Sequence, residues 1–318
     1  MRHEIGLWKY MNREDLGPLS VLNNGIRNLE SNHYNIVPDF RNCPTISIAS
    51  DYSGTHSAAE FEVLSFLFYD KQSLREWNKA RLLLRQEYHI GDREIAYKKL
   101  NDIIKRRALL PFLNIANNIS GLSVNIAIHK KVASLFAQKL LSPSELGWEK
   151  YNYWDSLAFE KMCRAVNLIG FFLAGITHSA QHILWITDED DIVANETYKA
   201  DTTEMFYSAL QHYSKGYLGS FSCETTALDD SSMELRDLAA IPDLVAGASC
   251  EILSQLHITK SIPNDEQLVP LPDSIPDKSN EIINWYADYS HPLKRLLYVI
   301  PPRSTPWKTH LMDFQRLS

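Results

Sequence analysis

Three aspartates lie at positions where strands are expected to end or a helix to begin. Asp51 closes the alternating run 45–51, and Asp188 directly follows the apolar run 183–187. Asp243 opens an apolar helical segment. If the two strands are neighbours and the helix packs across them, the three carboxylates converge. Mg²⁺ and Mn²⁺ prefer oxygen ligands, so such a cluster could hold two cations for phosphodiester hydrolysis.

Each of these acids also has a purely structural interpretation. Asp51 precedes Ser53-Gly54 and could close a turn between two strands. Asp188 could be a solvated turn residue, and Asp243 an acidic first-turn residue favoured by the helix dipole. The sequence does not fix the ligand position to within a few residues. The alternative metal ligands are Asp190 and Asp191 in place of Asp188, and Asp237 in place of Asp243.

The motifs around these acids resemble a known superfamily. The segment Ile48-Ala49-Ser50-Asp51-Tyr52-Ser53-Gly54, the strand ending at Asp188 and the segment 241–248 together resemble ribonuclease-H-like proteins. Within them the chain is similar to a bacterial family of unknown function with Asp-x-Ser-Gly and Ala-Asp-Leu-x-Ala-Gly motifs. The similarity spans roughly residues 44–256 by motif order. It implies an α/β fold with a mixed five-stranded sheet flanked by helices.

The resemblance also implies a function and a set of residues. Asp51, Asp188 and Asp243 take the acidic positions that hold Mg²⁺ or Mn²⁺ in a metal-dependent nuclease. Glu94, in Gly91-Asp92-Arg93-Glu94-Ile95, is similar to a segment that supplies a fourth catalytic acid.

Three residues depart from the family pattern, namely Tyr52 in place of Glu, Pro242 in place of Ala and Ala96 in place of Lys. These departures leave open the alternative of a noncatalytic ribonuclease-H-like scaffold or interaction protein.

The charge of the chain limits how it could bind nucleic acid, and its missing motifs exclude several classes of enzyme. The 318 residues carry a formal net charge of -7, which argues against nonspecific coating of nucleic acid. A local basic stretch over residues 93–107, followed by Lys130-Lys131, could contact the phosphates of DNA or RNA, and an ordinary solvated helix face explains it equally well. A protein partner or a homo-oligomer is compatible with the sequence. Phosphate-loop, dinucleotide and nucleophile-elbow motifs are missing, so motors, dehydrogenases and serine hydrolases are unsupported.

The cysteines and the apolar runs bear on the redox state and the location of the protein, and two histidines raise the question of zinc. Four scattered cysteines form no Cys-x-x-Cys pair, which favours reduced thiols. The first residues lack a signal-peptide core, and the apolar run 166–176 is too short to span a bilayer, so we expect a cytoplasmic protein. On a helix His178 and His182 would share a face suited to zinc, but no Glu follows His178 as in zincins, and a partly buried pair at a helix end is the favoured interpretation.

The local patterns divide the chain into three parts. Residues 1–43 are expected to form an irregular arm, with a turn at Asn23-Asn24-Gly25. For residues 44–260 the resemblance implies a ribonuclease-H-like domain, with a helical elaboration expected between its third and fourth strands. Residues 261–318 are a Pro-rich, turn-rich tail with one short helix at 281–289. The expected strands are 45–51, 62–69, 122–128, 183–187 and 219–226, and the expected helices are 71–87, 94–115, 154–177, 202–213 and 244–253.

Overall fold

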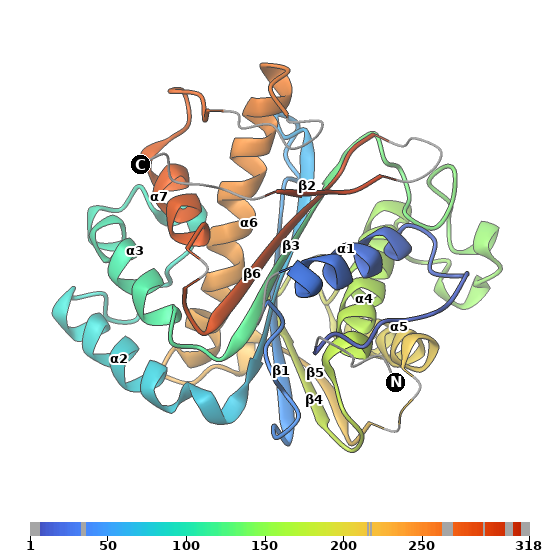
Figure 1. The fold of residues 1–318 in the computed structure, drawn as a ribbon, viewed down its shortest axis with the longest axis horizontal. Helices are drawn as coiled ribbons and strands as arrows, with labels where there is room; N and C mark the ends of the chain where they lie inside the picture. The colour runs from blue at the N-terminus through green and yellow to red at the C-terminus, as the bar shows by residue number, and fades with distance from the viewer. Residues whose placement is uncertain are drawn as a thin grey trace.

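The described strands form one mixed sheet, with helices packed on both of its faces (Figure 1). The computed structural model describes residues 7–32, 36–214, 216, 218–262, 270–288, 290–302 and 308–312. The sheet has seven strands in the order β5-β4-β1-β2-β3-β6-β7. The mixed α/β class is therefore as expected, whereas the expected count of five strands is wrong.

Strands β1 (Thr45–Ser53), β2 (Phe61–Asp70) and β3 (Gly121–His129) form an antiparallel meander. Their runs of β-branched and apolar residues predicted all three strands. The turn after β1 needs Gly54, whose φ is +99°. A Cβ atom at this position would lie 2.0 Å from the carbonyl oxygen of Phe61, so no other residue fits here.

Two parallel strands extend the sheet beyond β1. Strand β4 (His182–Thr187) pairs with β1, and β5 (Phe221–Thr225) pairs with β4. The first and fourth strands of the chain are thus neighbours, which is the arrangement that the convergence of the acids requires.

The two additional strands come from the segment expected to be a tail. Strand β6 (Leu293–Ile300) pairs in parallel with β3, and β7 (His310–Met312) pairs with β6. The prolines flank this segment, and the apolar run that forms β6 lies between them. The charged Arg295 interrupts that run, yet it is fully buried and donates a hydrogen bond of 2.9 Å to the carbonyl of Trp285.

The N-terminal segment is not irregular, because it contains helix α1 (Leu19–Asn32). Leu22 and Ile26 of this helix are fully buried in the core. Asn23 does not open a turn, since its amide side chain bonds Trp8 Nε1 at 2.9 Å and the carbonyl of Met11 at 2.8 Å. The division of the chain at residues 43 and 260 stays a prediction.

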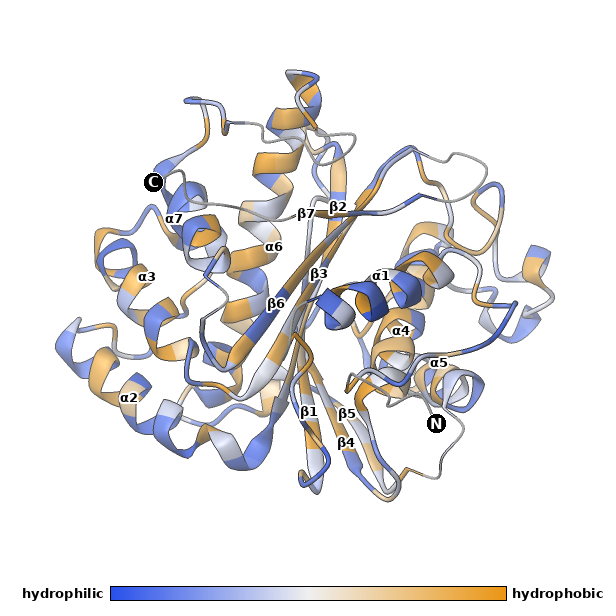
Figure 2. Cartoon of the chain, in the orientation of Figure 1, coloured by the Kyte–Doolittle hydropathy of each residue, from blue (hydrophilic) through white to orange (hydrophobic). Residues whose placement is uncertain are grey.

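Each face of the sheet carries its own apolar core. Figure 2 shows the apolar sides of the helices turned toward the strands. Helices α4 (Ser156–Ile176) and α5 (Glu196–Tyr213) cover one face with α1. The other face is covered by α2 (Leu74–Glu87), α3 (Ile103–Ala116), α6 (Glu234–Ile258) and α7 (Asp277–Tyr286).

Three helix predictions need correction. The expected helix 244–253 would have Pro242 in its first turn, but helix α6 begins at Glu234, so Pro242 lies inside it. Helix α3 begins at Ile103, and Glu94 lies in the preceding loop. The helical spacing over 71–87 predicts an apolar side made of Leu74, Trp77, Leu82 and Leu83, which is partly wrong because Leu82 and Leu83 are 45% and 65% exposed.

In the described part of the chain, no helix has the length and apolar character needed to cross a membrane. All four cysteines are free thiols, as expected.

Candidate metal centre

Asp51 lies near the end of β1 and faces helix α6. Side chains alternate between the two faces of a strand. Ile46 and Ile48 enter the core beneath α4, whereas Ala49 enters the core beneath α6. Asp51 shares the parity of Ala49, so its carboxyl group lies between the sheet and α6.

Asp188 reaches the same place from the neighbouring strand. Ser50 of β1 is paired with Thr187, the last residue of β4, so Asp51 and Asp188 occupy the next positions on parallel strands. The side chains of such a pair point to the same face. One oxygen of Asp188 accepts a hydrogen bond of 2.8 Å from the hydroxyl of Thr226, just after β5. This contact orients an otherwise exposed carboxylate.

Asp243 projects from the middle of α6 toward the sheet. One of its carboxylate oxygens accepts a hydrogen bond from the backbone N–H of Tyr97. The ring of Tyr97 rests on α6 at Gly247, where a Cβ atom would lie only 2.3 Å from the ring. Gly247 therefore brings the 95–97 segment close enough for that N–H to reach Asp243.

The carboxyl groups of Asp51 and Asp243 are close enough to share a hydrogen bond. Burial, then the negative charges of Asp243, Asp188 and Asp190, raise the pKa of Asp51 well above its usual value. Burial also raises the pKa of Asp243 to about 6. Without a cation the pair holds a proton, which Asp51 donates to Asp243. Carboxyl groups arranged in this way repel one another when ionised, and a bound cation would remove that repulsion.

Asp190 has a cation of its own. The ammonium group of Lys161 lies 2.7 Å from Asp190 and 3.9 Å from Asp191. Lys161 is nearly buried and lies over the ring of Tyr52. Since Asp190 is already neutralised by Lys161, Asp188 is the better candidate ligand of these three acids.

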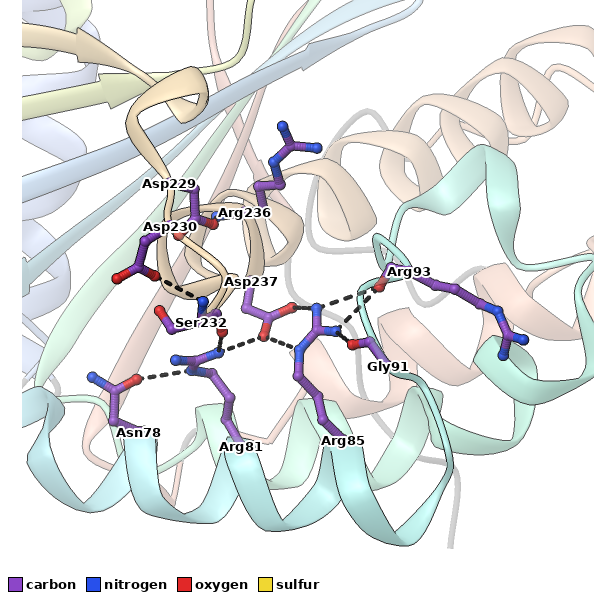
Figure 3. A network of polar contacts seen from close by, with 10 residues as sticks. All are labelled: Asn78, Arg81, Arg85, Gly91, Arg93, Asp229, Asp230, Ser232, Arg236 and Asp237. Atoms are coloured by element: carbon purple, nitrogen blue, oxygen red, sulfur yellow. Dashed lines mark hydrogen bonds and ion pairs between the residues drawn. The ribbon is translucent and has the colours of Figure 1, made fainter.

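Glu94 approaches the cluster from the loop between α2 and α3. Its charge contributes to the raised pKa of Asp243. Its carboxylate also forms an ion pair with Lys99, but these two side chains are more exposed than Lys161 and Asp190, so solvent screens their attraction more strongly. Arg85 holds this loop in place by donating hydrogen bonds to the backbone carbonyls of Gly91 and Arg93 (Figure 3).

Asp237, the substitute for Asp243, has a different environment. It accepts two hydrogen bonds from Arg85, at 2.7 and 2.6 Å, and one of 3.0 Å from Arg81 (Figure 3). Asp237 and Arg81 are each 1% exposed. Its carboxylate is therefore paired with two guanidinium groups, and we assign it a structural role.

The basic stretch is only partly available to a nucleic acid. Lys99 pairs with Glu94, Arg106 pairs with Glu281, and Lys105 is buried. Apart from the paired Lys99, the exposed cations of the two basic segments are Arg93, Lys98, Arg107, Lys130 and Lys131.

A second group of possible ligands was missed in the sequence. Among the described residues, Glu60, His129 and His257 form the group of three whose ligand atoms all lie within 4.8 Å of one another. The aspartate cluster is wider than this. No spacing signal could reveal the group, because its members are 69 and 128 residues apart in the chain. His178 and His182, by contrast, do not share a helix, since α4 ends at Ile176 and His182 begins β4.

Comparison with known proteins gives no family. No protein-family model matches the chain, and no curated protein matches it, so the resemblance to a bacterial family remains a prediction. Two similar solved structures are the PCNA:RNase HII complex from Archaeoglobus fulgidus and the ribonuclease H2 from Pyrococcus horikoshii OT3. The first is 13% identical, with a TM-score of 0.34 over 76% of this chain and 88% of that one. The second is 11% identical, with a TM-score of 0.36 over 77% of this chain and 100% of that one. Scores this low carry no argument about activity, which therefore rests on the residues described above.

Proposed function

We propose that the chain is a metal-dependent nuclease that hydrolyses phosphodiester bonds with Mg²⁺ or Mn²⁺. The observation that supports this most is the meeting of Asp51 and Asp243 at the sheet end beside Asp188. These residues come from three elements that are distant in sequence. Crowding of ionisable groups that raises their pKa values is typical of functional sites.

The donor set fits a hard divalent cation. It consists of carboxylate oxygens, which Mg²⁺ and Mn²⁺ prefer to nitrogen or sulfur ligands. Asp51, Asp188 and Asp243 would hold the cations, with Glu94 as a fourth acid near Asp243. When bound, such cations stabilise the negative charge that develops on the phosphate and on the attacking and leaving oxygens.

Residues around the cluster orient its carboxylate groups and could contact the substrate. Asp51 and Asp243 lose their shared proton when a cation binds. The Tyr97 N–H and the Thr226 hydroxyl each hold one oxygen of a ligand, which fixes the direction of the other oxygen. Exposed Arg93 and Lys98 lie in the loop that carries Glu94 and would contact the phosphate backbone of DNA or RNA.

The test is cleavage of DNA and RNA substrates with Mg²⁺ or Mn²⁺, comparing the wild type with Asp51→Asn. We expect Asp51→Asn to lower the rate by more than about 100-fold, an effect of the size seen when a group stabilising the reacting charge is lost. The matched control is Asp230→Asn, because Asp230 is an exposed aspartate that bonds Ser232. This variant should keep the wild-type rate.

Identical products from the wild type and Asp51→Asn would contradict the catalytic assignment. The noncatalytic alternative predicts a different result, in which Mn²⁺ does not bind to the cluster and partner binding survives neutralisation of both Asp51 and Asp243.

A further inference from the structure

Glu60, His129 and His257 lie together at the end of the sheet, well away from the aspartate cluster. Glu60 immediately precedes β2, His129 ends β3, and His257 lies in the last turn of α6, which runs alongside β2 and β3 (Figure 1). His257 is fourteen residues beyond Asp243 on α6, which is about 21 Å at the rise of an α-helix. The group is therefore separate from the proposed catalytic centre.

The distances between the ligand atoms match those around zinc. The Nε2 atoms of His129 and His257 are 3.3 Å apart, and each is 3.9 Å from Oε2 of Glu60. Tetrahedral zinc with ligands at about 2.0–2.2 Å keeps neighbouring donor atoms about 3.3–3.6 Å apart. Shifts of a few tenths of an ångström would complete the geometry.

The backbone of all three residues is held by other contacts. Phe61 pairs with His129 across β2 and β3, and the N–H of Lys130 bonds the carbonyl of Glu60 at 2.9 Å. The N–H of Glu60 bonds the hydroxyl of Ser254 on α6 at 3.0 Å. The ring of Phe61 packs edge-on against both imidazoles. The three ligands are therefore arranged before any metal arrives.

From this geometry we infer that Glu60, His129 and His257 form a zinc site that ties β2 and β3 to the end of α6. Two imidazoles and one carboxylate favour zinc over Mg²⁺, which prefers oxygen ligands. His129 is fully buried, whereas the side chains of Glu60 and His257 are 39% and 33% exposed. Solvent can therefore supply the fourth ligand as water.

One hydrogen bond has to change when zinc binds. The N–H of Lys131 donates to Nδ1 of His129 at 3.0 Å, which places the ring proton on Nε2, facing His257. Zinc on Nε2 requires this proton to move to Nδ1, so the bond to Lys131 is lost. Because the Nδ1 proton would then face the Lys131 N–H, which is also a donor, the change lowers the zinc affinity by roughly 5- to 150-fold.

The experiment is a zinc titration of the full chain after treatment with a chelator, followed by calorimetry or competition with a coloured zinc indicator. We expect one zinc per chain with a Kd below about 10 µM. His257→Ala should weaken zinc binding at least about 30-fold. Glu60→Gln should also weaken zinc binding, but by a smaller factor. Both residues are partly exposed, so these variants should fold. Cobalt at this site should give the intense visible absorption of a tetrahedral complex, and His257→Ala should lose it.

Two controls keep the site distinct from the catalytic proposal. His56→Ala removes an exposed histidine from the loop that carries Glu60 and should leave zinc binding unchanged. Asp51→Asn should also leave it unchanged, whether or not the chain is a nuclease. A wild-type Kd above about 10 µM, or equal zinc affinity in the wild type, His257→Ala and Glu60→Gln, would overturn the inference and leave a hydrogen-bonded histidine pair.

Discussion

Asp237 and Asp243 lie six residues apart on α6, yet their environments are opposite. Asp237 is enclosed by the guanidinium groups of Arg81 and Arg85. Asp243 faces the carboxyl group of Asp51, with Asp188 and Glu94 nearby. One aspartate is neutralised by the protein itself, and the other is placed among like charges.

This difference separates a structural acid from a candidate metal ligand. A buried ion pair satisfies its own charges, and it stabilises only if both partners stay. A cluster of acids costs stability until a proton or a cation joins it. Clusters of this second kind are the ones for which metal binding has an energetic reason. Four predictions test the difference between the two kinds of acid.

The largest expected effect on stability is from Asp237→Asn. The substitution leaves Arg81 and Arg85 buried without a full counter-charge, so we expect a loss of about 3–5 kcal/mol in the free energy of unfolding. Urea unfolding measures this directly. The exposed control Asp230→Asn should change the stability by less than about 0.5 kcal/mol. A loss below about 1 kcal/mol for Asp237→Asn would contradict the assignment of a structural ion pair.

Asp51→Asn should have the opposite sign. The amide group can still donate a hydrogen bond to Asp243, as protonated Asp51 does, but it carries no charge. At pH 7 without divalent cations, we therefore expect the variant to be more stable than the wild type by about 1–3 kcal/mol. Added Mn²⁺ should stabilise the wild type and not the variant, which reduces the gap in melting temperature. A variant less stable than the wild type in the presence of a chelator would contradict this assignment.

The pH dependence of that gap provides a third check. The pKa of Asp243 is raised to about 6 and that of Asp51 is raised too, so the folded state binds protons more tightly than the unfolded state. The contribution of Asp243 to stability is fully present below about pH 4 and is lost as the pH rises through about 6, and that of Asp51 is likewise present below about pH 4 and is lost as the pH rises through its own raised pKa. The gap between Asp51→Asn and the wild type should therefore be small near pH 4 and widen toward pH 7. Urea midpoints across this range measure it, and a gap that does not change with pH would exclude the shared proton.

Much of this contrast could be predicted from local sequence patterns. The apolar runs that precede Asp51 and Asp188 predict that both acids lie near strand ends. Because β1 and β4 pair in parallel, these two ends lie side by side. The choice between Asp237 and Asp243 could not be made, because it depends on Arg81 and Arg85, which belong to a helix about 150 residues earlier in the chain. Sequence periodicity even assigned the exposed Leu82 and Leu83 to the buried side of that helix.

The parts that were missed share a dependence on distant contacts. Strand β6 is buried because β3 and β7 lie beside it, and its own sequence includes Lys294 and Arg295. Helix α1 persists through Asn23 because Trp8 and Met11 satisfy its amide group. The Glu60, His129 and His257 group joins three elements that no spacing rule connects.

Asp190 is an intermediate case, and it carries the smallest expected effect. It lies near Asp51, yet the ammonium group of Lys161 neutralises it at 2.7 Å. Asp190→Asn should therefore lower Mn²⁺ affinity by less than about threefold, whereas Asp188→Asn should lower it by more than about tenfold. The reason is that, of these two acids, Asp188 is the one without a basic partner among the contacts of the described residues. Calorimetric titration of both variants compares them directly. If Asp190→Asn weakened binding more than Asp188→Asn, the ligand would be Asp190, and pairing with a lysine would not distinguish structural acids from metal ligands in this protein.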